Sequence, residues 1–312
     1  IIFFWVARMI MAGLEWRGKV PFKNVYFTGI VRDKQRRKMS KSLGNSPDPL
    51  ELIDKYGADS VRVGILLSSA AGNDLLFDED LMLQGRNFVT KIYNAFKLTQ
   101  SWTKEAKPAG EAEKQTIIWF ENQMNKTISE INDQFEKFRI SDALHLLYKL
   151  IWDDFCSWYL EAVKPNFGES ISQEVYDQTI RFFEELMRLL HPFMPFLTEE
   201  IYQHIAERNT SEALVIAQQK NAESFDENII SAFDTVKEII SGVRNYRQSK
   251  GISPRESVEL FTNVANFANE AVVRKLANIS VVHFAEKTEK PSFTFLVGAT
   301  EISIPLLSLI HI

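Results

Sequence analysis

The chain of 312 residues is long for one domain, so its length favours two or three. Apolar residues make up 45% and charged residues 25%, which fits a folded protein with a large core and excludes general disorder. The single cysteine, Cys156, excludes an internal disulfide and a thiolate metal cluster, and it fits a reducing, cytoplasmic compartment. No apolar run is long enough to span a membrane, so we expect no membrane partner.

The chain begins with the apolar residues 1–5, without a starting Met, a basic region before them or a suitable cleavage site after them. We therefore expect an internal-to-C-terminal piece of a longer protein and not a signal peptide. Residues 3–14 favour a helix, with Gly13 near its end. Residues 24–31 are rich in β-branched and aromatic types and favour a strand.

A basic loop follows this predicted strand. Against the single acid Asp33 it carries six basic side chains, namely Arg32, Lys34, Arg36, Arg37, Lys38 and Lys41. On a protein whose net charge is −5, this predicts a local positive patch. The string KMSKS at 38–42 places two lysines three residues apart among small hydroxyl residues, which suits an oligophosphate. Gly44 can adopt positive φ and let the loop close. The alternative is a solvated basic loop or a nuclear-localisation-like cluster.

The rest of the chain has mainly helical patterns. Asp48 and Pro49 start a helix that Gly57 ends, and a second helix follows over residues 58–69. Further helices are predicted at 78–102, 112–138, 141–163, 172–190 and 196–208, which together indicate a helical bundle. A long helix at 227–250 then precedes predicted strands at 258–262, 281–284, 293–297 and 301–305, with a helix near 266–276. This last part reads as a small α+β module.

The stretch from Phe3 to Trp102 resembles the class Ia aminoacyl-tRNA synthetases. The matching motifs are, in order, FFWVARMIMAG, YFTGIVRD, RKMSKSLGN and DPLELIDKYGADSVR. Later, RLLHPFMPFLTEEIYQ (188–203) and VRNYRQSKGISP (243–254) resemble the anticodon-binding domain of that family. Three segments are most similar to the valine enzymes, namely the first of these motifs, the segment with GND and FDED (72–80), and GRNFVTKIYNA (85–95). An isoleucine or other branched-chain synthetase stays an alternative, and so does a helical RNA-binding or adaptor module.

The resemblance implies a mainly α chain in three domains. Residues 1–77 would be the C-terminal remnant of a Rossmann-like α/β catalytic domain, residues 78–225 the helical anticodon-binding domain, and residues 226–312 the long helix with the α+β module. The implied partners are ATP with Mg²⁺, valine and tRNA(Val), with no DNA and no tightly bound cofactor. Lys38 and Lys41 would be catalytic by gripping the triphosphate. The ATP loop would be completed by Met39, Ser40, Ser42 and Asn45.

Other side chains are candidates on the same resemblance. Ile1 and Trp5 would line the valine pocket, the alternative being plain core. Four basic residues of the bundle would contact the tRNA phosphates, the alternative being that they are ordinary surface charges. They are Lys91, Lys126, Arg139 and Lys149. The signature His-x-Gly-His motif and the editing domain of the family are absent, so we expect the chain alone to be inactive.

The remaining polar and thiol groups predict no second site. We expect no protein metal site, because the histidines at 145, 191, 204, 283 and 311 lack metal-ligand spacing. We expect Cys156 to be buried and inert, and His191 to be a residue of a helix junction. The acidic pairs at 184–185 and 199–200 read as solvated helix faces.

Overall fold

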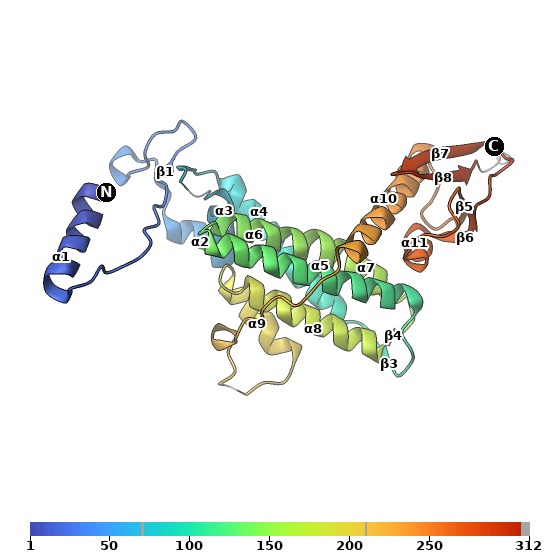
Figure 1. Cartoon of the computed structure of the whole chain (residues 1–312), viewed down its shortest axis with the longest axis horizontal. Helices are drawn as coiled ribbons and strands as arrows, with labels where there is room; N and C mark the ends of the chain where they lie inside the picture. Colours follow the sequence, from blue (N-terminus) through green and yellow to red (C-terminus); the bar gives the residue numbers. More distant parts are fainter. Residues whose placement is uncertain (70–71, 210, 307–312) are drawn as a thin grey trace.

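The computed structural model describes residues 1–69, 72–209 and 211–306. The molecule is elongated, and its parts follow one another along the long axis (Figure 1). Helix α1 (Ala7–Arg17) lies at one end and a helical bundle occupies the middle. Helix α10 (Glu227–Lys250) leads from the bundle to a small four-stranded sheet at the other end. The chain is therefore mainly α-helical, as predicted.

The N-terminal segment departs from the prediction in two places. A π-helical turn at Ile2–Val6 runs into α1, which continues past Gly13 to Arg17. The strand predicted over 24–31 is wrong except at its end, where β1 (Val31–Arg32) pairs in parallel with β2 (Leu75–Leu76). A strand is held by hydrogen bonds to a neighbour, and within the described chain residues 24–30 have no partner strand.

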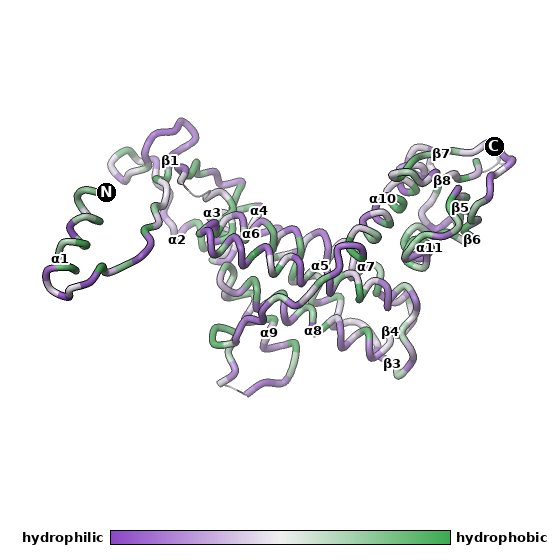
Figure 2. The backbone as a smooth tube through the Cα atoms, viewed as in Figure 1, coloured by the Kyte–Doolittle hydropathy of each residue, from purple (hydrophilic) through white to green (hydrophobic). Residues whose placement is uncertain are grey.

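Figure 2 shows that α1 is rich in hydrophobic residues while the loop above β1 is hydrophilic. None of the α1 side chains is buried, and Trp16 is 80% exposed. Among the described residues, no helix combines the length and the apolar character that crossing a bilayer requires.

The predicted capping of α2 by Asp48 is confirmed, and α4 has a similar cap at Asp78 that was not predicted. Asp48 accepts a hydrogen bond from the Leu50 amide (2.8 Å) at the start of α2, and Asp78 accepts one from the Asp80 amide (3.1 Å) at the start of α4. The helices of the central part are α2 (Pro49–Tyr56), α3 (Ala58–Ser68), α4 (Glu79–Gln100), α5 (Glu111–Glu136), α6 (Ile140–Lys149), α7 (Leu160–Val163), α8 (Gln173–Leu190) and α9 (Pro195–Ile205). Between α6 and α7 the chain stays helical through a π-helix at Leu150–Tyr159.

The bundle core is formed mainly by aromatic and aliphatic side chains of α4 to α8. Phe120 of α5 packs against Tyr159 and against Phe182 of α8, with ring centroids 4.9 and 5.0 Å apart. The Trp119 ring stacks almost parallel on the Phe233 ring of α10, with the ring centroids 3.8 Å apart, so the first turns of α10 are anchored on the bundle. Helix α3, which lies in the first predicted domain, also contributes to this core through Val63 and Leu67.

Three of the four glutamates that we expected to be solvated differ from that expectation. Glu185 is only 5% exposed, because it faces Arg188 one turn later and pairs with it. Glu184 pairs with Arg188 and Arg208, and Glu199 accepts a hydrogen bond from the Leu214 amide at 2.9 Å. Burial of these carboxylates is possible because each has a partner; only Glu200 of the four is exposed.

The C-terminal module matches its prediction within about two residues at most strand ends. Its elements are β5 (Val258–Thr262), α11 (Glu270–Ala277), β6 (Ile279–Phe284), β7 (Ser292–Val297) and β8 (Thr300–Pro305). The strand order is β6-β5-β8-β7, with β5 and β6 parallel around the α11 crossover. The buried Arg247 guanidinium of α10 donates to four backbone carbonyls, those of Ser253, Glu256, Ala277 and Asn278. Residues 307–312 of the third predicted domain lie outside the described residues.

Candidate functional site

The KMSKS loop is closed by one side-chain amide. Asn45 donates from Nδ2 to Asp33 Oδ2 (3.0 Å) and to the Lys38 carbonyl (3.3 Å), and its Oδ1 accepts from the Ser40 amide (2.9 Å). Asp33 in turn accepts from the amides of Gln35 and Arg37. The pair of Asp33 and Asn45 therefore connects the start of the loop with its end, and Asn45 also binds Lys38 and Ser40 between them.

The serines of the loop shape a short 3₁₀ turn at Lys41–Leu43. Ser40 caps this turn, because its Oγ accepts from the Leu43 amide at 3.3 Å, and it lies 3.1 Å from Ser42 Oγ. Gly44 ends the turn with φ of +65°, a conformation that costs glycine little. The predicted loop-shaping roles of these hydroxyls match this geometry, although their role toward ATP stays a prediction.

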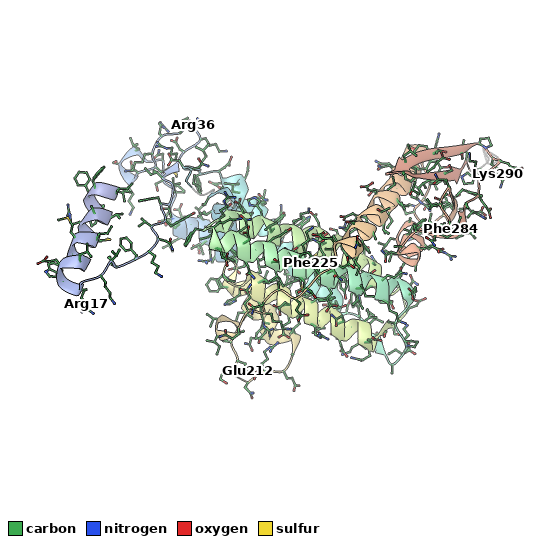
Figure 3. The ribbon with its side chains drawn as sticks, viewed as in Figure 1. Arg17, Arg36, Glu212, Phe225, Phe284 and Lys290 are labelled. Atoms are coloured by element: carbon green, nitrogen blue, oxygen red, sulfur yellow. The ribbon has the colours of Figure 1, made fainter. Side chains whose placement is uncertain are left out.

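The charge of the loop differs from the sequence count. Three of its six basic side chains are paired with carboxylates: Arg37 with Asp33, Arg32 with Asp74, and Lys34 with Asp78. In the described part of the chain, the other three have no ion-pair partner, and these are Arg36, Lys38 and Lys41. Figure 3 shows Arg36 at the outer tip of the loop. The sequence therefore overstates the positive patch, since Asp74 and Asp78 are distant in sequence but close in space.

The pairing holds the carboxylates ionised. Hydrogen bonds from Asn45 and Arg37 lower the pKa of Asp33 to about 2. The hydrogen bond from Arg32 lowers the pKa of Asp74, and that from Lys34 lowers the pKa of Asp78. The paired bases are thus committed to neutralising these acids, and Arg36, Lys38 and Lys41 remain to meet an anion.

A cleft of about 610 Å³ lies between the loop and the start of α4. Met39 and Asn45 line it together with Phe77, Asp78 and other residues, whereas Lys38 and Lys41 do not. Of the six residues predicted to bind ATP, only Met39 and Asn45 line this cleft. Four acids and two bases line the cleft, so its charge does not favour an oligophosphate.

The other predicted site residues lie apart from the loop. Ile1 and Trp5 are 74% and 60% exposed at the start of the chain, and the Arg8 guanidinium lies 6.0 Å from the Trp5 ring. The described chain alone does not bury them, so plain core of the parent protein stays an alternative to the pocket. Their contact with valine stays a prediction.

The four candidate tRNA contacts have different surroundings. The Lys91 amine lies 5.4 Å from the Trp152 ring, and Lys126 pairs with Glu227 at 2.9 Å. Arg139 and Lys149 are exposed and have no ion-pair partner among the described residues. The latter two are therefore freer to meet a phosphate than the former two.

Metal and thiol chemistry receive no support from the described residues. No group of three or more His, Cys, Asp or Glu side chains there could hold a metal ion, and His311 lies outside them. Cys156 is buried, and burial raises the pKa of its thiol to about 12. His191 lies at the end of α8 with Nδ1 2.8 Å from Thr198 Oγ1, as expected for a junction residue.

Sequence reasoning missed Asp33 and Asp74 as organisers of the loop. It also missed Asp59 and Arg62, which connect α3 to the turn between α8 and α9. All four fall within the motifs YFTGIVRD, GND and DPLELIDKYGADSVR that carried the resemblance. Their presence in those motifs was the available signal, but a role could be assigned only once their partners were known.

Two protein families match the chain. The family of tRNA synthetases class I (I, L, M and V) matches residues 1–78, and the anticodon-binding domain of tRNA ligase matches residues 118–262. The second match extends across the predicted boundary at 225/226 and includes α10, which is anchored on the bundle.

Similar proteins support a narrower assignment. The chain is 52% identical to the valine–tRNA ligase of Phocaeicola vulgatus and 51% identical to that of Parabacteroides distasonis. Both alignments cover 100% of this chain and 36% of the relative. The valine–tRNA ligase of Fusobacterium nucleatum is 37% identical, over 98% of this chain and 37% of its own length. The chain thus spans about a third of the length of these relatives.

A solved structure supports the fold. A LeuRS of Agrobacterium radiobacter K84, crystallised in a ternary complex with tRNA and LeuAMS, aligns with a TM-score of 0.50 and 20% sequence identity. The alignment covers 72% of this chain and 27% of that protein. At this identity the similarity concerns the arrangement of the elements only.

Proposed function

The chain belongs to the valine–tRNA ligase family of the class I tRNA synthetases, and on this premise we propose that its parent protein charges tRNA(Val) with valine. In the reaction that this implies, the valine carboxylate attacks the α-phosphate of ATP and releases pyrophosphate. The aminoacyl group then passes to a hydroxyl of the terminal adenosine of the tRNA. ATP enters as its Mg²⁺ complex, and both belong to the substrate.

No side chain of the loop has to act as a nucleophile in this reaction. The attacking oxygen comes from the substrate, so the protein contributes positioning and electrostatic stabilisation. As the bond to pyrophosphate breaks, negative charge increases on the leaving group. Lys38 and Lys41 would stabilise that charge, while Ser40 and Ser42 hold the turn that presents them.

One observation carries this proposal. The loop is clamped by Asp33 and Asn45, and nearby acids neutralise three of its bases and leave Arg36, Lys38 and Lys41 unpaired. An ordinary solvated basic loop has no need of such a clamp. A preorganised loop with unpaired cations binds a polyanion at a lower entropic cost.

The remaining substrates follow from the same premise. We propose that Ile1 and Trp5 border the valine pocket, completed by parts of the parent protein beyond this chain. The bundle would bind the anticodon stem and loop, with Arg139 and Lys149 as its freest cations. The charged tRNA serves translation in the cytoplasm, where we place the protein. Because the chain spans about a third of its relatives, we expect it to show no valine-dependent ATP–pyrophosphate exchange by itself.

The test is an aminoacylation and pyrophosphate-exchange assay on the parent protein, with valine and isoleucine in parallel. We expect valine to be activated and attached to tRNA(Val). A preference for isoleucine would reassign the enzyme within class Ia. Activity with neither amino acid, together with retained tRNA binding, would replace the proposal by a helical RNA-binding module.

A further inference from the structure

Helix α9 begins without a cap of its own. Its N-cap residue is Met194, whose side chain makes no capping hydrogen bond, and Pro195 at the first helical position has no N–H. The next two amides, of Phe196 and Leu197, would be left without acceptors. They donate instead to Asp59 of α3, to Oδ1 at 3.3 Å and to Oδ2 at 2.7 Å. Asp59, 137 residues earlier in the chain than Phe196, thus serves as the cap of α9.

Arg62 of α3 binds the other side of the same turn. Its Nε donates to the Phe193 carbonyl at 3.1 Å, and a second guanidinium nitrogen donates to the Pro192 carbonyl at 3.0 Å. These carbonyls belong to the turn between α8, which ends at Leu190, and α9. The acid of α3 thus faces the positive start of α9, and the base holds two carbonyls of the turn that precedes it.

The two residues lie three positions apart, so they project from the same face of α3 one above the other. Asp59 is 6% exposed, and its two oxygens bind the two α9 amides. Arg62 reaches the turn from the exposed edge of α3. A further bond fixes the far end of α3, because Ser141 of α6 donates to the Leu67 carbonyl at 3.2 Å. Helix α3 is therefore held against the bundle at both ends.

Packed structure also connects α3 to the KMSKS loop. Helix α2 begins four residues after Asn45, and Leu52 of α2 packs with Val61 of α3 and Met82 of α4 in one small core. Lys55 and Tyr56 of α2 both bind Glu79 of α4, at 2.8 and 2.9 Å. From the loop to Asp59, the chain therefore has no long unstructured linker that would absorb a displacement.

We propose that Asp59 and Arg62 form a latch that sets the position of the KMSKS loop relative to the helical bundle. They are positioning residues, since neither lies on the loop or among the groups that would touch ATP. A shift of the α8–α9 turn, as on binding an RNA to the bundle, would be passed through α3 and α2 to the loop. The functional part of this proposal rests on the proposed function, whereas the latch itself can be tested without it.

The first experiment measures amide hydrogen exchange in the chain itself. In Asp59→Ala, the amides of Phe196 and Leu197 lose their acceptors, and we expect them to exchange about tenfold faster. Amides of the α6 core should be unchanged. Asp59→Asn keeps an acceptor oxygen and should give an intermediate rate. The matched control is Asp54→Ala, an exposed acid of α2 without a hydrogen-bond partner in the described chain, which should change neither amide.

Unchanged exchange at both amides in Asp59→Ala would overturn the latch. If that variant does not fold, Asp59→Asn and Arg62→Lys replace it. Each keeps part of the contact, so exchange rates equal to those of the wild type in both would also refute the proposal.

The second experiment uses the parent protein and asks whether the latch acts at the loop. We expect Arg62→Gln to lower kcat for valine activation about tenfold while KM for ATP changes less than about twofold, and Arg62→Lys to restore part of kcat. If Arg62 has a purely structural role, Arg62→Gln should instead lower the midpoint of unfolding and leave kcat per folded molecule unchanged. That result would refute the action of the latch on the loop. If the wild type itself does not activate valine, the proposed function fails while the exchange result still decides the latch.

Discussion

Asn45 Nδ2 lies 3.0 Å from Asp33 Oδ2, and this hydrogen bond closes the KMSKS loop across twelve residues. The same side chain accepts from the Ser40 amide, so the loop cannot open without breaking both contacts. Because the Asn side chain has a donor and an acceptor at fixed positions, no other residue of similar size serves both partners. The Asn in the motif is thus required by geometry, independently of any contact with a ligand.

Replacing Asn45 with Asp should open the loop. The new carboxylate would face Asp33 and would lose the amide donor, so like charges would repel where a hydrogen bond had been. We expect kcat/KM for ATP in the parent enzyme to fall about tenfold or more, because binding must then also order the loop. Gln35→Glu is the matched control, since it adds the same charge to the same loop without touching the clamp. Equal losses in both variants would mean that charge alone, and not the clamp, matters.

The pH dependence of the loop follows from Asp33. Its pKa is about 2 in the folded chain and 3.8 ordinarily, so the folded state favours the carboxylate. A lowered pKa contributes stability that is fully present above about 3.8 and is lost as the pH falls through 2. We expect the NMR signal of the Asp33 carboxyl carbon to titrate near pH 2, and at a higher pH in Asn45→Ala, in which the hydrogen bonds from Arg37 to Asp33 remain. A wild-type midpoint at 3.8 would contradict the clamp.

Lys41 should act mainly in the transition state. Because charge moves toward pyrophosphate as the reaction proceeds, Lys41→Ala should lower kcat for activation more than it raises KM for ATP. The expected cost is roughly 2.7–4 kcal/mol, by analogy with the removal of one oxyanion-hole donor. Lys34→Gln is the control, since Lys34 belongs to the same loop but is paired with Asp78. An effect confined to KM would show that Lys41 only binds ground-state ATP.

Local signals in the sequence predicted much of this structure. The cap Asp48 and the apolar face of α8 act within one or two turns, so such helices are readable from the sequence. The KMSKS loop is likewise contiguous and could be located. The strand over 24–30 was wrong because a strand depends on a distant neighbour. For the same reason, the pairing of Arg32 with Asp74 and the capping of α9 by Asp59 could not be foreseen.

Close packing of α3 on α4 predicts an unusual response at Gly85. Helix propensity alone would make Gly85→Ala stabilising by about 1 kcal/mol. However, a Cβ at this position would lie 2.2 Å from the Ser60 backbone oxygen, so the helices must separate. We expect net destabilisation of about 1–2 kcal/mol in urea unfolding of the chain followed by circular dichroism. Asn94→Ala on the exposed face of the same helix should stabilise by a few tenths of a kcal/mol, about what propensity predicts. A stabilising Gly85→Ala would show that the helices can move apart at little cost.

The bundle should bind tRNA(Val) with modest affinity. The net charge is −5, and of the four candidate cations Lys126 is already paired, so we expect only about three to five neutralised phosphates. The logarithm of the binding constant should then fall against the logarithm of salt concentration with a slope of roughly −2 to −4. Side chains cannot read the deep groove of an A-form stem, so specificity should come from unstacked bases of the anticodon loop.

Anisotropy titrations of the chain at two salt concentrations, with native and anticodon-swapped tRNA(Val), test this expectation. Lys149→Ala should reduce the slope by about 1, because Lys149 is exposed and unpaired in the described chain, whereas Lys126→Ala should change it less. Swapping the anticodon should weaken binding while the stem contacts and the slope persist. Equal affinity for both tRNAs would leave only non-specific electrostatic attraction. Absence of binding at low salt would instead favour an adaptor module that retains a synthetase-like loop, since a bundle that reads an anticodon must bind where screening is weakest.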